Sequence, residues 1–111
     1  MKYLTRQEVL ILLSIFQLKN EAYLVSIRKH LKKITGRNWS MGAVYVPLDR
    51  LRRLGYLDTR IGEPQARLGR NNIKYYQLTR QSISALAEIK NVDELAWHGF
   101  SEIAFKTLKY G

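Results

Sequence analysis

The sequence contains no cysteine, and its 111 residues include only two prolines and nine acidic side chains. Without cysteine there is no disulfide scaffold, thiolate nucleophile or cysteine-ligated metal, which is compatible with a reducing compartment. No apolar run approaches the roughly 18 residues that cross a bilayer. The apolar stretch within residues 4–18 lacks a small-residue cleavage site after it, so we interpret it as a core helix and not as a signal peptide. These absences favour a cytoplasmic protein.

The scarcity of acidic residues leaves a strong positive charge that is unevenly distributed. Nineteen Lys and Arg residues against nine Asp and Glu give a formal net charge of +10. Residues 1–78 contain 15 basic and 5 acidic side chains, whereas residues 79–111 contain four of each. A polyanion is therefore the expected partner of the first two-thirds of the chain. Nucleic acid is the first interpretation; an anionic membrane surface is the second, and it requires basic residues opposite an exposed apolar face.

Residue patterns for catalysis and metal binding are also scarce. The two histidines, His30 and His98, are isolated in the sequence. No glycine-rich phosphate loop follows a predicted strand, and no paired carboxylates stand at a spacing that suggests acid–base chemistry. We therefore expect no enzyme activity, no cofactor and no metal site.

The residues that are present predict two helices at the start. Thr5-Arg6-Gln7-Glu8 has the pattern of a capping box and predicts a helix that continues to about Leu18. A second helix is predicted from about Glu21 to Thr35, with Gly36 as its left-handed cap. Its expected inner face consists of Leu24, Ile27, Leu31 and Ile34. Its outer basic residues, which either contact a polyanion or simply face solvent, are Arg28, Lys29, Lys32 and Lys33.

The segment from Ser40 to Gly55 is the most informative part of the chain. It predicts a third helix, with Ser40 as the N-cap and Gly55 directly after the C-terminus. Pro47 is expected to bend this helix without breaking it, because it lies within the first two turns. The apolar face, at helical spacing, consists of Val44, Leu48, Leu51 and Leu54. The other side carries Tyr45, Asp49, Arg50, Arg52 and Arg53. A helix of this kind fits the major groove of DNA.

Two β-prone segments follow, at residues 56–61 and 73–78, with Leu57, Thr59 and Ile61 expected on one face of the first. The intervening loop carries Arg67 and Arg70 among turn-forming residues, so a hairpin with a basic tip is predicted. Thr79 is predicted to cap a final helical region that extends to about residue 110, with a bend or division at residues 90–93.

This order of elements predicts a fold that is mainly α with a small β-hairpin. The second and third helices form a helix-turn-helix, and the hairpin makes it a winged helix. We expect a winged helix-turn-helix domain for DNA binding at residues 1–78 and a helical extension at residues 79–111. The extension has too many large apolar side chains for a solvated tail.

The pattern Ser-x-Gly-Ala-Val-Tyr-x-x-Leu-Asp-Arg-Leu-x-x-x-Gly-Tyr-Leu (residues 40–57), followed by Lys-Tyr-Tyr-Gln-Leu-Thr (residues 74–79), resembles the PadR-like transcriptional regulators. The resemblance covers residues 4 to 86. It implies a prokaryotic dimeric repressor, whose C-terminal helix is the dimerisation element and packs with helix one of the partner. The chain departs from the family pattern at Val46, which separates Tyr45 from Pro47, and at Gln81-Ser82, where a glycine often follows the threonine.

The candidate DNA-contacting residues lie on the third helix and the wing. On the helix they are Ser40, Tyr45, Arg50 and Arg53, and the resemblance implies DNA contact for Tyr45 and Arg50. On the wing they are Arg67, Arg70 and Lys74. Two alternatives stay open: Tyr45 packs against the second helix instead, and the two loop arginines are merely solvated. Asp49 is expected to orient an arginine or the wing.

Trp97 and Phe100 raise the question of a small-molecule effector. Some multidrug-sensing members of the family stack planar cationic compounds on a tryptophan of the C-terminal helix at the dimer interface. The resemblance thus implies a planar aromatic or hydrophobic effector at Trp97 and Phe100. The alternative is that both side chains are dimer core, since aromatic residues are common in interfaces.

These observations predict a sequence-specific regulator that binds duplex DNA as a homodimer, most simply as a repressor on a palindromic operator. The alternative is a winged-helix interaction module that binds a protein partner through its apolar C-terminal region. In that case the basic residues only keep the chain in solution.

Overall fold

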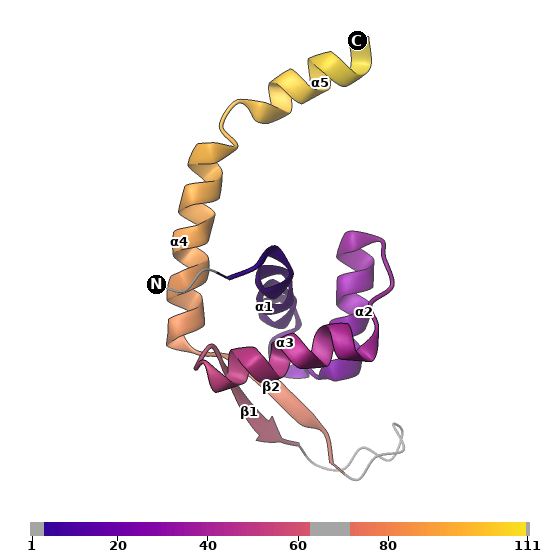
Figure 1. Cartoon of the computed structure of the whole chain (residues 1–111), viewed down its shortest axis with the longest axis vertical. Helices are drawn as coiled ribbons and strands as arrows, with labels where there is room; N and C mark the ends of the chain where they lie inside the picture. The colour runs from indigo at the N-terminus through magenta and orange to yellow at the C-terminus, as the bar shows by residue number, and fades with distance from the viewer. Residues whose placement is uncertain (1–3, 63–71, 111) are drawn as a thin grey trace.

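The computed structural model describes residues 4–62 and 72–110 and contains the predicted order of elements (Figure 1). The elements are α1 (Arg6–Leu18), the 3₁₀ turn η1 (Lys19–Glu21), α2 (Leu24–Thr35), α3 (Met41–Arg53), β1 (Leu57–Ile61), β2 (Lys74–Leu78), α4 (Arg80–Ala96) and α5 (Phe100–Tyr110). The predicted fold class, a mainly helical winged helix with a C-terminal helical extension, is confirmed.

Local sequence signals set most of the helix boundaries. In the predicted capping box of α1, Glu8 N–H donates to Thr5 Oγ1 (3.1 Å) and Thr5 N–H donates to Glu8 Oε1 (2.8 Å). Gly36 caps α2 with a φ of +75°, the left-handed conformation that glycine adopts without steric cost. Helix α3 continues through Pro47 without a break, as expected for a proline near the helix start.

The second helix begins later than predicted, at Leu24 instead of near Glu21. Its predicted first turn is divided between η1 and two extended residues. The carbonyl of Ala22 accepts a hydrogen bond from Tyr76 N–H (2.8 Å), and Tyr23 forms an isolated β-bridge with Tyr75. The chain is extended here because residues 22 and 23 pair with β2 as a short third strand of the hairpin sheet.

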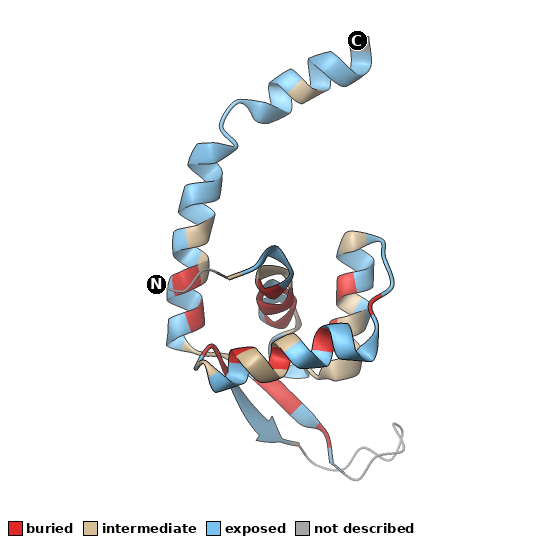
Figure 2. Ribbon diagram, in the orientation of Figure 1, coloured by how far each residue is buried: buried red, intermediate tan, exposed pale blue. Residues whose placement is uncertain are grey.

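The wing is an antiparallel hairpin whose register runs from Leu57 opposite Leu78 to Ile61 opposite Lys74. Only the first residue of the expected inner face of β1 is buried. Thr59 and Ile61 are exposed because the hairpin projects away from the helices (Figure 2).

One hydrophobic core joins α1, α2, α3, the base of the hairpin and the start of α4. Its fully buried side chains include Ile11, Leu12, Ile27, Leu31, Val44, Leu48 and Leu51. Ile34, predicted for the inner face of α2, is exposed in the last turn of that helix, and Leu24 is only half-buried. The centre of the helix-turn-helix is therefore buried by residues of this chain alone.

The C-terminal region divides at Trp97–Gly99, so the expected division at residues 90–93 is wrong. Gly99 has a φ of +80° and supplies the left-handed conformation between α4 and α5. Residues 90–93 stay helical, and an i,i+4 ion pair between Lys90 and Glu94 (2.7 Å) spans them.

The final part of the chain extends away from the core. Ser82 and Ala85 of α4 are buried against the core, whereas residues 91–109 are exposed apart from the half-buried Ala104 (Figure 2). The molecule measures 55 × 31 × 21 Å, and its radius of gyration is 16.7 Å; about 13 Å is typical of a compact chain of this length. We call residues 91–109 the C-terminal arm, and residues 4–62 and 72–90 the winged body.

Candidate nucleic-acid interface

Helix α3 has a fully buried side and a fully solvated side. Val44, Leu48 and Leu51 have no exposed surface. Gly42, Val46 and Arg53 lie on the opposite side and are exposed. An exposed aliphatic side chain such as Val46 suits a thymine methyl group, and an arginine suits guanine or phosphate. The solvated side of α3 therefore has the chemistry of a helix that enters a DNA groove.

The N-terminus of α3 is held by three hydrogen bonds. Ser40 Oγ accepts from Ala43 N–H (3.0 Å), which confirms Ser40 as the predicted N-cap. The buried indole of Trp39 donates from Nε1 to Thr35 Oγ1 (3.1 Å), and Arg28 Nε donates to the Trp39 carbonyl (3.0 Å). The turn between α2 and α3 is thus fixed from both sides, and Arg28 has a structural role that the sequence did not reveal.

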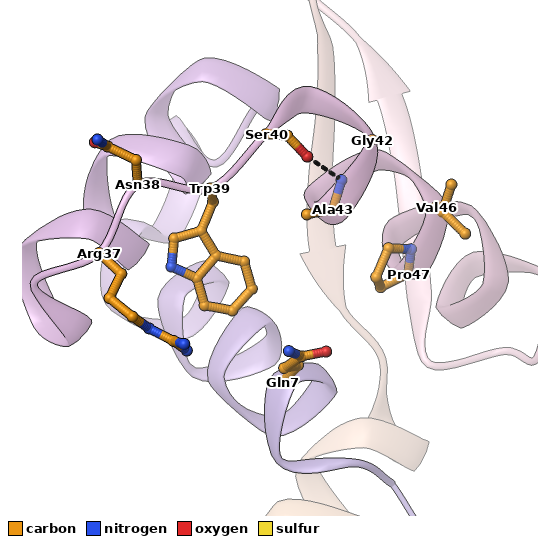
Figure 3. Close-up of a pocket in the computed structure, with 9 residues that line it drawn as sticks. All are labelled: Gln7, Arg37, Asn38, Trp39, Ser40, Gly42, Ala43, Val46 and Pro47. Atoms are coloured by element: carbon orange, nitrogen blue, oxygen red, sulfur yellow. Dashed lines mark hydrogen bonds between the residues drawn. The ribbon is translucent and has the colours of Figure 1, made fainter.

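An open pocket of about 620 Å³ lies beside this turn (Figure 3). The indole of Trp39 lies between the turn and Gln7 of α1, and Arg37 and Asn38 lie on the turn (Figure 3). We did not predict Gln7, Arg37 or Asn38 as interface residues. The available signal was a basic residue and an amide three and two positions before a helix N-cap, close to the place where anions are stabilised.

Arg50 lies on the α1 flank of α3 and forms an ion pair with Glu8. Glu8 is only 4% exposed, and its other carboxylate oxygen accepts the hydrogen bond of the capping box. Tyr45 precedes Arg50 by five residues, which places the two side chains about 140° apart around the helix. Tyr45 and Arg50 therefore lie on opposite flanks of the solvated side of α3, with Arg53 between them, and Arg50 remains partly exposed.

Asp49 organises the arginines at the C-terminal end of α3. Its carboxylate oxygens accept from Arg52 Nη2 (3.2 Å) and Arg53 Nε (3.0 Å). These hydrogen bonds, from Arg52 first and then Arg53, lower the pKa of Asp49 below its ordinary value. The prediction that Asp49 orients an arginine is supported by this geometry, and Arg53 stays exposed while it is held.

The wing places Lys74 and Tyr76 near Tyr45. These three residues line one small cavity with the first turn of α2, and Tyr45 is about half exposed. Burial, and then the neighbouring Tyr45 and Asp49, raise the pKa of Tyr76 above its ordinary value. Tyr45 thus borders α2 and still faces solvent. Arg67 and Arg70, the predicted residues of the loop tip, lie outside the described residues.

Trp97 and Phe100 flank the junction between α4 and α5. Their rings meet edge to face, with centroids 5.0 Å apart and an interplanar angle of 84°. Both side chains are more than half exposed in the single chain, at 58% and 53%. The predicted ligand residues are therefore brought together. Phe100 also lines an open pocket of about 500 Å³ along α5, and Trp97 is not among the residues that line it.

Residues 4–62 and 72–110 contain no helix long and apolar enough to cross a membrane. In the same residues, no three His, Cys, Asp or Glu side chains group closely enough to hold a metal ion.

Comparisons with solved structures show similar folds throughout the chain. A protein from Streptococcus mutans UA159 superposes with a TM-score of 0.69 at 21% identity, covering 100% of both chains. A PadR-like transcriptional regulator from Bacillus cereus has a TM-score of 0.67 at 22% identity, covering 94% of this chain and 92% of that one. A PadR family transcription regulator from Clostridium difficile has a TM-score of 0.65 at 18% identity, covering 94% and 99%.

At the level of sequence, no curated protein matches the chain. A family model does match, and it is described as the transcriptional regulator PadR-like family. The match covers residues 12–88, from α1 to α4, which is more than half of the chain. The chain therefore belongs to the PadR-like family of transcriptional regulators.

Proposed function

We propose that the chain is a homodimeric repressor that binds a palindromic duplex operator in the cytoplasm and blocks transcription by occupying it. The observation that supports this proposal most directly is the difference between the two sides of α3. The apolar side is completely buried, whereas the side with Val46 and Arg53 is exposed. The excess of basic residues in residues 1–78 supports the same assignment.

In this proposal the two predicted parts of the chain have different functions. Residues 1–78 bind DNA, and residues 79–111 bring two chains together. The first turns of α4 link the two parts, because Ser82 and Ala85 are buried against the core.

The arm supports the dimer because its apolar side chains have no partner in this chain's core. Leu108 is 86% exposed, and Phe100 and Ile103 are more than half exposed on the same helix. An apolar groove of about 630 Å³ lies between α1 and α4 and is open to a partner. Its apolar lining consists of Val9, Leu13, Phe16, Ile83, Leu86, Ala87 and Ile89. A second copy's α5 packed in this groove would cover both apolar surfaces.

A planar aromatic or hydrophobic effector fits the same place. In the dimer, Trp97 and Phe100 would line the space between the two arms, and a ligand there would change how the two bodies are spaced. Release of the operator by such an inducer is part of the proposal.

The test is a fluorescence anisotropy titration with a duplex from the region upstream of the chain's own gene. We expect saturable binding that weakens steeply with salt. Arg53→Ala should weaken binding about tenfold and reduce the salt slope by about 1, because one charge contact is lost. Lys106→Ala is the matched control, since Lys106 lies on the arm and is paired with Glu102.

Reversing the charge of Arg50 is a less suitable test, because a carboxylate at that position would face the buried Glu8. Absence of binding to any duplex at low salt, by a folded wild-type chain, would contradict the proposed function and favour the interaction module. Equal losses for Arg53→Ala and Lys106→Ala would remove α3 from the interface.

A further inference from the structure

A cavity of about 170 Å³ lies where α3, the first turn of α2 and strand β2 meet. It is small and lies on the wing side of α3. The residues that matter for its chemistry are Leu24 and Val25 of α2, Tyr45 of α3, and Lys74 and Tyr76 of β2.

The first turn of α2 offers backbone donors to this cavity. Helices α1, α3 and α4 each have a side-chain oxygen that accepts a first-turn N–H, from Thr5, Ser40 and Thr79 respectively. The N-cap of α2 is Tyr23, whose ring cannot act in this way, and its own N–H donates to Ser26 Oγ (2.9 Å). Within the described residues, the N–H groups of Leu24 and Val25 therefore have no acceptor, and the helix dipole favours an anion there.

The hydroxyl of Tyr76 is a second hydrogen-bond donor at this cavity that has no acceptor. Tyr76 is only 4% exposed, and its hydroxyl has no hydrogen-bond partner in the described part of the chain. The hydroxyl is not sealed from solvent, because the same residues contain no completely buried side-chain polar atom without a partner. Since its ring lines the cavity, the cavity is the open route to it. Burial raises the pKa of Tyr76, so the hydroxyl remains a donor at neutral pH.

The remaining polar groups around the cavity are also suited to an anion. Lys74 is exposed and forms no ion pair with any described carboxylate. Asp49 is the carboxylate that contributes to the raised pKa of Tyr76, and it already accepts hydrogen bonds from Arg52 and Arg53. The residues that carry these groups, Leu24, Val25, Tyr45, Lys74 and Tyr76, thus line the same cavity, and none of them is a carboxylate.

We propose that this cavity binds one backbone phosphate of duplex DNA, through the N–H groups of Leu24 and Val25, the hydroxyls of Tyr45 and Tyr76, and the ammonium of Lys74. The proposal rests on the proposed function, because it assigns the phosphate to DNA bound by α3. The cavity lies between α3 and the wing, so the strand that borders the groove occupied by α3 passes over it. Contacts to phosphate position the protein and carry no sequence information.

The test compares two neighbouring tyrosines of β2. Tyr76→Phe removes the hydroxyl at the cavity and keeps the ring. Tyr75→Phe is the matched control, because Tyr75 is also buried but packs its ring against Tyr23 (centroids 5.7 Å apart) and outside the cavity. By fluorescence anisotropy, Tyr76→Phe should weaken binding about tenfold for the upstream duplex and by the same factor for a random duplex of equal length. Tyr75→Phe should leave both affinities within about twofold of the wild type.

A charge variant and an NMR titration give further readouts. Lys74→Gln should lower the slope of log affinity against log salt concentration by about 1, whereas Tyr76→Phe should leave the slope unchanged. Amide signals of Leu24 and Val25 should shift when the duplex is added and shift less in Tyr76→Phe. Inorganic phosphate at the same ionic strength should shift them only at much higher concentration.

Three outcomes separate the possibilities. If the wild type binds DNA and Tyr76→Phe behaves like Tyr75→Phe, the phosphate site is wrong while the proposed function stands. If inorganic phosphate shifts the two amides at the concentration at which the duplex does, the cavity is a free-anion site and not a DNA contact. If the wild type binds no duplex, the proposed function fails first and the phosphate site fails with it.

Discussion

The winged body and the C-terminal arm differ in whether their apolar side chains are buried by the same chain. In the body, apolar side chains at helical spacing are buried by other parts of the same chain, as for Ile27, Val44 and Leu48. In the arm, equally apolar side chains such as Leu95 and Leu108 are 81% and 86% exposed. Residues 1–78 also hold the entire charge excess, whereas residues 79–111 are neutral in sum. A single chain thus buries the apolar side chains of the winged body and leaves those of the arm exposed, and the proposed dimer rests on this difference.

The largest expected effect comes from adding charge to the arm. The double variant Phe100→Asp with Leu108→Asp should produce a folded monomer, because burial of each such side chain contributes about 1.5–3 kcal/mol. Affinity for the upstream duplex should fall about 100-fold or more, since two linked contacts become one. Sedimentation equilibrium and anisotropy measure the two effects, with Lys106→Gln on the charged side of α5 as the control. A dimer that persists in the double variant would contradict the role of the arm.

A smaller effect is expected inside the body, from the ion pair between α1 and α3. Arg50→Ala leaves the carboxylate of Glu8 nearly buried and without its cation. The free energy of unfolding should fall by about 2 kcal/mol, less than for a completely buried pair because Arg50 is partly exposed. Urea denaturation measures this, and Arg52→Ala should change stability by less than about 0.5 kcal/mol. Equal stabilities of the two variants would show that the Glu8 pair is not structural.

Two glycines of the body should respond in opposite directions to alanine. Gly36 has a φ of +75°, so Gly36→Ala strains the cap of α2 and should destabilise by about 1 kcal/mol. Gly42 lies in α3 with nothing within 4 Å of an added Cβ, so Gly42→Ala should stabilise by about 0.5–1 kcal/mol. Thermal unfolding of both variants measures the contrast. A shift of the same sign in both would contradict the conformations assigned to these glycines.

The smallest expected effect is the acid response of Asp49. Its pKa is lowered in the folded chain by Arg52 and Arg53, so its contribution to stability is complete above the ordinary value of 3.8 and is lost as pH falls through the lowered pKa. The effect is slight because the carboxylate is solvated. An NMR titration of Asp49 should show its pKa rising toward 3.8 when Arg52 and Arg53 are both replaced by alanine. An unchanged pKa in that variant would show that the two arginines do not hold the carboxylate in solution.

The sequence predicted the features that depend on neighbouring residues. Thr5, Ser40 and Thr79 cap the helices that they were expected to cap, because side-chain capping acts within three residues. Gly99 is a local signal for the true division of the C-terminal region, since an isolated glycine in a helical pattern is a typical C-terminal cap.

Features that join distant parts of the chain were not predictable in this way. Glu8 was recognised only as a capping residue, whereas its second role depends on Arg50, 42 positions later. The delayed start of α2 similarly depends on the pairing of Ala22 with Tyr76. Neither contact has a local pattern, because each is set by how the helices and the hairpin pack.

Hydroxyl-radical footprinting of the wild-type chain on its own upstream DNA tests both parts of the molecule at once. If α3 enters the groove and the arm pairs two chains, the expected footprint consists of two half-sites related by a two-fold axis and spaced by whole turns of the duplex. A single unpaired half-site would contradict the dimer, and uniform cleavage along the duplex would contradict DNA recognition by the winged body.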